Sequence, residues 1–132
     1  MDIKKSSYYD ELAASIPDEL GAAILSILTQ AGVGRRNALG RGELTFAVQG
    51  KGYGVHERQV RYCIHDLRRA GHLICSAPGA GGGYYLAANR TEFEEFCQRE
   101  LHPKALDMLE TEKAMKASAR QQFGEAVQLG LI

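Results

Sequence analysis

The feature that most constrains this fold is an amphipathic helix that stops at a glycine and precedes two short β-rich segments. The helix is predicted from His56 to Ala70, and its apolar residues recur at i, i+3, i+4 and i+7. This apolar face consists of Val60, Cys63, Ile64 and Leu67. Gly71 is expected to end the helix in the left-handed conformation. The segments HLICSA and GYYLA flank a glycine tract and predict a β-hairpin with a flexible tip.

Two helices are predicted upstream of this one. Residues 17–30 form the first, because their apolar positions follow a helical stripe. That stripe consists of Leu20, Ala23, Ile24, Ile27 and Leu28. Residues 31–41 are predicted to form a loop that includes a short extended piece around Ala38 and Leu39. The second helix is expected from Gly40 to Gln49, with Leu44, Ala47 and Val48 facing inward.

Downstream of the hairpin the sequence is predicted to be helical. Thr91 and Glu94 suit a capping box that opens a fourth helix. Its inward residues are expected to be Phe93, Phe96 and Cys97. Pro103 either kinks this helix or starts a new one, and residues 104–123 have strong helical propensity. The predicted organisation is an N-terminal segment (1–16), a domain (17–90), a helical extension (91–123) and a loose tail (124–132).

The charge of the chain is unevenly distributed although its net charge is zero. Residues 1–34 carry −3, residues 35–76 carry +5, and residues 77–132 carry −2. The chain has 132 residues, the size of one ordinary domain. The basic section 35–76 therefore forms a large part of that domain. Such a section is typical of a surface that binds a polyanion.

The sequence favours a cytoplasmic location and no membrane association. No apolar run approaches the ~18 residues that a membrane span needs. The first 15 residues have no apolar stretch that would serve as a signal peptide. The odd number of cysteines, Cys63, Cys75 and Cys97, indicates reduced thiols rather than a disulfide framework.

The segment GVHERQVRYCIHDLRRAGHLICS resembles the winged helix-turn-helix domains of the biotin-repressor type. Val60, Ile64, Leu67 and Gly71 fit the core pattern of that group, and the resemblance covers about residues 17–88. His56 departs from it, since a serine or threonine usually opens the recognition helix. A softer likeness is to phage and prophage proteins with a long helical tail. The resemblance implies a mainly α fold with a small β-hairpin wing, and binding to double-stranded DNA.

The expected DNA-binding residues lie opposite the apolar face of the third helix and in the basic loops before it. Arginine can bond a guanine edge through two hydrogen bonds, and His, Gln and Tyr can contact bases or phosphates. On the third helix and at its cap they are His56, Glu57, Arg58, Gln59, Arg61, Tyr62, His65, Arg68 and Arg69. Before it they are Arg35, Arg36, Arg41 and Lys51. The expected wing residues are Gly79, Gly81, Gly82 and Gly83, which would contact DNA through the main chain.

No catalytic, metal or cofactor site is predicted. Cys63, His65, His72 and Cys75 match no standard zinc spacing, and Cys63 belongs to the core face while His65 points away. The segments GKGYG and GAGGG lack the lysine and the setting of a phosphate loop. No nucleophile has both a base and an orienting acid. The chain is therefore expected to be a non-enzyme without a cofactor.

The C-terminal helix has two interpretations. Ala105, Met108, Met115 and Ala119 keep a 3–4–3 rhythm that Glu112 interrupts, and Leu106 and Leu109 widen the stripe. The helix either packs back on its own domain or serves as a dimer arm. The first-helix stripe with Phe93 and Phe96 already suffices to close the domain core. That slightly favours a homodimer.

The sequence thus predicts a cytoplasmic DNA-binding protein, either a prophage-type transcription regulator or a replication accessory factor. A protein-interaction adaptor built on a winged helix is the alternative, because winged helices also serve as interaction modules. Arginines on an exposed helix are often only a solvated face. Fold order and charge together favour DNA.

Overall fold

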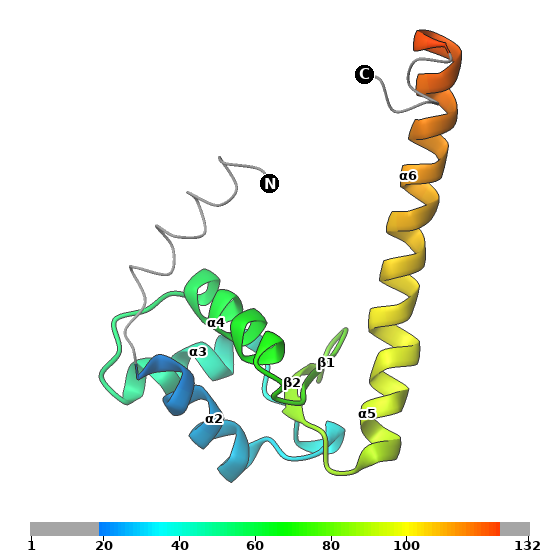
Figure 1. Cartoon of the computed structure of the whole chain (residues 1–132). Helices are drawn as coiled ribbons and strands as arrows, with labels where there is room; N and C mark the ends of the chain where they lie inside the picture. The colour runs from blue at the N-terminus through cyan, green and yellow to red at the C-terminus, as the bar shows by residue number, and fades with distance from the viewer. Residues whose placement is uncertain (1–18, 125–132) are drawn as a thin grey trace. The chain divides into compact units, whose positions relative to one another are not determined.

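The structure is a computed structural model that describes residues 19–124 and divides into two compact units, Met1–Phe96 and Cys97–Ile132. The described part of the first unit contains α2 (Leu20–Ala31), η1 (Arg35–Asn37), α3 (Arg41–Gly50), α4 (Glu57–Arg69), β1 (Ile74–Ala77), β2 (Gly83–Leu86) and α5 (Arg90–Phe96). The second contains the π-helical turn η2 (Cys97–Leu101) and α6 (His102–Phe123). Four α-helices and a two-stranded antiparallel hairpin in the described part of the first unit, with the long helix α6 in the second, confirm the predicted mainly α fold class with a small β part (Figure 1).

Helix α2 supplies one wall of the core. The five buried residues of α2 are those of the predicted stripe: Leu20, Ala23, Ile24, Ile27 and Leu28. The helix stops at Gly32, whose N–H donates to the Leu28 carbonyl at 2.8 Å. The proposed start at Pro17, the N-terminal segment 1–16 and residues 125–132 of the tail lie outside the described residues.

The connection from α2 to α3 pairs with the hairpin. Leu39 and Tyr84 exchange two backbone hydrogen bonds of 2.8 Å, and Val33 forms a second bridge to Leu86. The extended piece expected around Ala38 and Leu39 is therefore a short edge on β2. This pairing ties the start of α3 to the second strand of the hairpin.

A hydrogen-bonded turn sets α3 against α4. In α3, Leu44, Thr45 and Val48 are buried. At its far end the Gln49 side-chain amide donates to the Val55 carbonyl at 2.8 Å, which closes the turn that precedes α4. Gly52 lies in this turn with φ +99°, a conformation that favours glycine.

Helix α4 forms as predicted, one residue shorter at each end. Val60, Cys63 and Ile64 are buried in it. At its C-terminus the Gly71 N–H donates to the Arg68 carbonyl and the His72 N–H to the Leu67 carbonyl, both at 3.0 Å. With φ +103° at Gly71, these two bonds make the Schellman ending, so the predicted glycine stop is confirmed.

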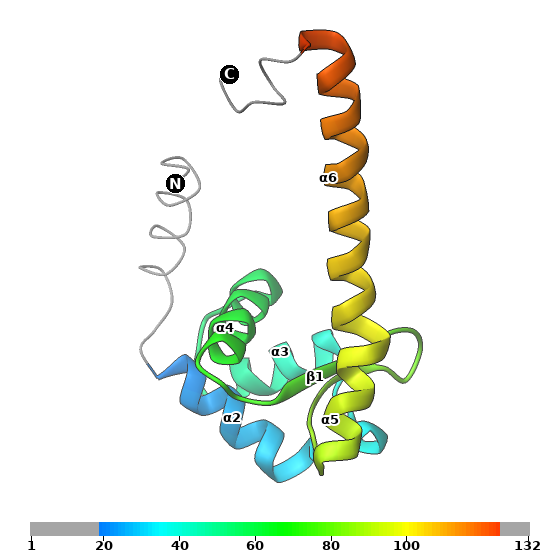
Figure 2. The same cartoon turned by 45° about the vertical axis from the view of Figure 1, so that its right-hand side comes forward.

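The hairpin separates two apolar clusters. Its strands pair from Ile74 opposite Leu86 to Ala77 opposite Gly83. Side chains alternate between the two faces of a strand, so Ile74 packs with α2, α3 and α4. Cys75 and Tyr85 instead pack with Phe96 of α5. Figure 2 shows α5 and the hairpin from a second side.

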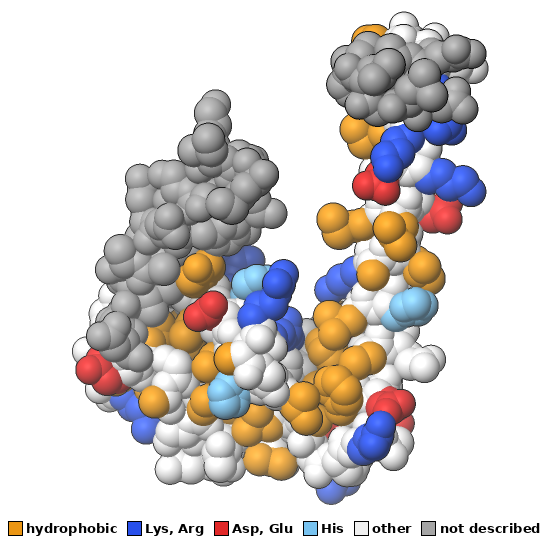
Figure 3. Space-filling model, in the orientation of Figure 1, with side chains coloured by type: hydrophobic (Ala, Val, Ile, Leu, Met, Phe, Trp, Pro, Cys, Tyr) orange, Lys and Arg blue, Asp and Glu red, His pale blue; other side chains and the backbone are white. Residues whose placement is uncertain are grey.

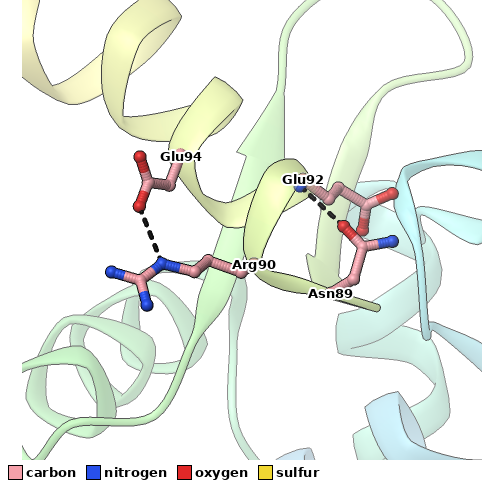
Figure 4. A network of polar contacts seen from close by, with 4 residues as sticks. All are labelled: Asn89, Arg90, Glu92 and Glu94. Atoms are coloured by element: carbon pink, nitrogen blue, oxygen red, sulfur yellow. Dashed lines mark hydrogen bonds and ion pairs between the residues drawn. The ribbon is translucent and has the colours of Figure 1, made fainter.

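The start of α5 corrects a predicted cap. Asn89, rather than Thr91, precedes the helix: its Oδ1 accepts the Glu92 N–H at 2.9 Å. Glu92 Oε1 also accepts the Ala88 N–H at 3.0 Å. Figure 4 shows the Asn89–Glu92 bond and the pairing of Glu94 with Arg90 at 3.0 Å. The expected Thr91–Glu94 box is wrong because the chain turns into the helix two residues earlier than that motif requires.

The first unit extends to Phe96, the last residue of α5. Phe96 is 4% exposed and packs against Cys75 and Tyr85, so α5 packs with the hairpin. In the second unit Pro103 lies in the first turn of α6, where the N–H that proline lacks is not needed. The chain is helical on both sides of this point, because η2 ends at Leu101 and α6 begins at His102. Between residues 19 and 124, no helix is both long and apolar enough to cross a bilayer.

Candidate nucleic-acid interface

The outward side of α4 carries a row of basic side chains. Arg58, Arg61, His65 and Arg69 are all exposed, and they are named here the basic face of α4. They lie three or four residues apart, so helical geometry places them on the side opposite Val60 and Ile64. Figure 3 shows Lys, Arg and His side chains gathered over this part of the first unit. The predicted facing of the helix is confirmed by the burial of Val60, Cys63 and Ile64.

Arg41 extends the basic face of α4 onto α3. Its Nε lies 3.8 Å from Glu57 Oε1, and both side chains are about half exposed or more. Exposed pairs of this kind contribute at most about 1 kcal/mol to stability. Arg41 therefore lies beside the first turn of α4, and its guanidinium remains largely exposed.

Tyr84 on β2 is a site residue that sequence reasoning missed. It is half-buried, and it interacts electrostatically with Arg41, Arg61 and Arg68. Burial raises the pKa of Tyr84 more than these arginines lower it, so its hydroxyl keeps its proton at neutral pH. A neutral phenol among arginines can donate a hydrogen bond to a phosphate or a base.

Arg68, one of the expected DNA-binding residues, lies at the junction of α4, β1 and α5. Its Nε donates to the Ile74 carbonyl at 2.6 Å, and its Nη2 lies 3.3 Å from Ser76 Oγ. Its guanidinium also lies 5.4 Å from the centre of the Phe96 ring, within range of a cation–π contact. Burial lowers its pKa. Arg68 thus fixes α4 to β1 and to α5 instead of facing a ligand.

Gln59, another expected DNA-binding residue, is buried at the start of α4. It is 9% exposed, and its Oε1 accepts the His56 N–H at 3.1 Å. The side chain therefore caps the first turn of α4, in the role that glutamine plays in a capping box. His56 itself is exposed at the start of the helix, and Tyr62 is half-buried.

The remaining basic residues occupy other places. Arg35 and Arg36 lie exposed on η1, which packs against both strands of the hairpin. The neighbouring Gly34 lies beside Ala88 and Glu92, at the start of α5. Lys51 lies exposed in the turn after α3. Among the described residues, Arg41 is the one of these four basic residues for which the structure shows a contact with α4.

The wing glycines fall into two groups. Gly79 and Gly81 have φ +84° and +77° at the tip, a conformation that glycine adopts without strain. Gly82 is half-buried, and its N–H donates to the Gly79 carbonyl at 3.0 Å. Gly83 lies within β2, where a Cβ would overlap the Leu39 carbonyl. Gly83 is therefore required by the pairing of Leu39 with β2, and is not part of the tip.

Cys63 predicts a pH dependence of stability. Burial, with a smaller contribution from Asp66, raises the pKa of its thiol to about 11. The unfolded value is about 8.5, so Cys63 adds stability at low pH that is lost as the pH rises through about 11. We expect the free energy of unfolding, measured in urea, to fall between about pH 8.5 and 11. It should fall less with pH in Cys63→Ala than in the wild type. An equal loss in both proteins would contradict this assignment.

Among residues 19–124, no group of three or more His, Cys, Asp or Glu side chains is arranged to hold a metal ion. Comparison of the chain with protein-family models, with curated proteins and with solved structures gives no significant match.

Proposed function

We propose that this chain is a non-enzymatic protein that binds double-stranded DNA through the basic face of α4. It would act as a transcription regulator or as a phage-type replication accessory factor. The observation that carries the proposal is the exposed row formed by Arg58, Arg61, His65 and Arg69. This row lies on a helix whose opposite side is buried in the core.

The anchoring supports insertion into a groove. The major groove is about 12 Å wide and admits one α-helix. Helix α4 buries Val60 and Ile64 on one side and is tied to β1 through Arg68. A helix held in this way can present its basic face without losing much conformational freedom on binding. Each arginine there can recognise a guanine or a phosphate.

The surroundings of α4 add phosphate-binding chemistry. Residues 35–76 carry a net charge of +5, which favours a polyanion. Arg41 and Tyr84 lie at the edge of the basic face and can contact the sugar–phosphate backbone. The tip between β1 and β2 has no Lys or Arg, so its contribution would come from the main chain.

The salt dependence of binding to a duplex tests the proposal. We expect log Kd, measured by fluorescence anisotropy with a random-sequence duplex, to rise linearly with log salt concentration. The slope should be about 0.9 per phosphate contact. A selection of bound sequences from random duplexes should then enrich a motif. If the chain does not bind duplex DNA even at low salt, the proposal is wrong and a protein-interaction adaptor becomes the better interpretation.

A further inference from the structure

Helix α6 carries a mainly apolar face, named here the α6 face. It consists of Ala105, Met108, Leu109, Met115, Ala119 and Phe123, with Glu112 and Lys116 in its middle. At 100° per residue these eight side chains fall on one third of the helix circumference. Met108, Leu109, Met115 and Phe123 are 74%, 60%, 68% and 62% exposed, and α6 has no buried residue. A strip of this kind is usually covered by protein.

The α6 face also contains an ion pair. Glu112 Oε1 lies 3.6 Å from Lys116 Nζ, and both side chains are about 60% exposed. These two charges lie one turn apart, between Leu109 on one side and Ala119 on the other. A covering partner must therefore offer both apolar contacts and one charge of each sign near the centre.

The order of charges along α6 indicates which partner can do so. After Lys104 in its first turn, three acidic residues, Asp107, Glu110 and Glu112, precede three basic ones, Lys113, Lys116 and Arg120. A second α6 in antiparallel orientation places the acidic segment of one helix against the basic segment of the other. A parallel in-register pair places like charges together, with Glu112 facing Glu112, and like charges at an interface are unfavourable.

We propose that α6 pairs with α6 of a second copy of this chain in antiparallel orientation, with Glu112 of each copy facing Lys116 of the other. This register also places two large apolar side chains against small ones. Leu109 faces Ala119 of the second copy, and Phe123 faces Ala105 of the second copy. Large residues then fill the space that small ones leave, which is how helices pack closely.

The pairing does not depend on the proposed function. It concerns the second unit alone, whereas the basic face of α4 belongs to the first. It would give each assembly two copies of the DNA-binding unit. The mass of the protein is measured without DNA, so a failure of this proposal is distinguishable from a failure of DNA binding.

Sedimentation equilibrium of the full chain at micromolar concentration tests the pairing. We expect a dimer for the wild type and a monomer for Leu109→Lys. The matched control is Leu106→Lys, because Leu106 lies off the α6 face and is itself 48% exposed. The control should remain a dimer, and circular dichroism should show equal helix content in all three. A monomeric wild type, or a control that dissociates as readily as Leu109→Lys, would overturn the proposal.

A charge exchange tests the orientation and the register. Glu112→Lys places lysine against Lys116 of the second copy, and Lys116→Glu places two glutamates together. Each variant alone should dimerise at least ~10-fold more weakly than the wild type. Mixing the two variants should restore dimers, because every facing pair then has opposite charges. Full-strength dimers of either single variant, or a mixture that stays monomeric, would show that Glu112 and Lys116 do not face each other.

Discussion

Replacing Ile64 by alanine is expected to destabilise the first unit by about 2–5 kcal/mol, the range for emptying a buried aliphatic site. Ile64 is 1% exposed and packs in the cluster formed by α2, α3, α4 and Ile74 of β1. The surrounding side chains come from four elements and cannot all relax into the space that is left. Small domains are stable by only about 5–15 kcal/mol, so this single change removes a large part of the total.

Urea unfolding followed by circular dichroism measures this loss. His65→Ala is the matched control, since His65 is the next residue of the same helix and is exposed. It should change the free energy of unfolding by no more than about 0.5 kcal/mol. Leu67→Ala should lie between the two, because Leu67 is only half-buried. Equal stabilities for the Ile64 and His65 variants would mean that the orientation of α4 is wrong.

The local elements of this fold could be predicted because their signals lie within a few residues of each other. The i, i+3, i+4 pattern around Val60 and Ile64 fixes which side of α4 faces the core. The helix ends at Gly71, where the Gly71 N–H bonds the carbonyl three positions earlier and the His72 N–H bonds the carbonyl five positions earlier. Successive residues of GYYLA point to opposite faces of the strand. Tyr84 therefore packs against the cluster of α2, α3 and α4, and Tyr85 against the cluster that contains Phe96.

The roles of individual polar side chains could not be predicted in this way. Helical spacing places Arg68 at the edge of the outward face, but the Ile74 carbonyl and Ser76 hydroxyl that it binds come from β1. Gln59 sits three residues after His56, a spacing that suits either a cap or a ligand contact. Which use prevails depends on burial, and burial follows from the packing of α4 as a whole.

Tyr84 shows the same limit at longer range. Its place beside Arg41 and Arg61 depends on the pairing of Leu39 with β2, across 45 residues of sequence. Nothing in the local pattern of the hairpin indicates that pairing. Gly83 is a partial signal, because a glycine inside a strand often marks the close approach of another backbone. Here that backbone belongs to Leu39.

The double variant Arg58→Ala/Arg61→Ala is expected to lose much of its affinity for the selected duplex and most of its sequence preference. A lost base contact costs about 1–3 kcal/mol, roughly 5- to 150-fold in Kd for each arginine. A lost phosphate contact instead weakens all duplexes alike and lowers the salt slope by about one. Both side chains are exposed on the basic face of α4, so the melting temperature should stay close to that of the wild type.

The pair Arg35→Ala/Arg36→Ala is the matched control, since it removes the same charge from exposed positions of the same unit. These arginines lie on η1, beside the start of α5, and not on α4. The control should weaken selected and random duplexes by the same small factor, because it changes only the net charge near the DNA. Anisotropy titrations with both duplexes separate the two results. If the two double variants lose affinity equally and keep their sequence preference, α4 neutralises phosphates without reading bases. If the α4 variant binds like the wild type, the basic face of α4 is not the DNA-binding surface.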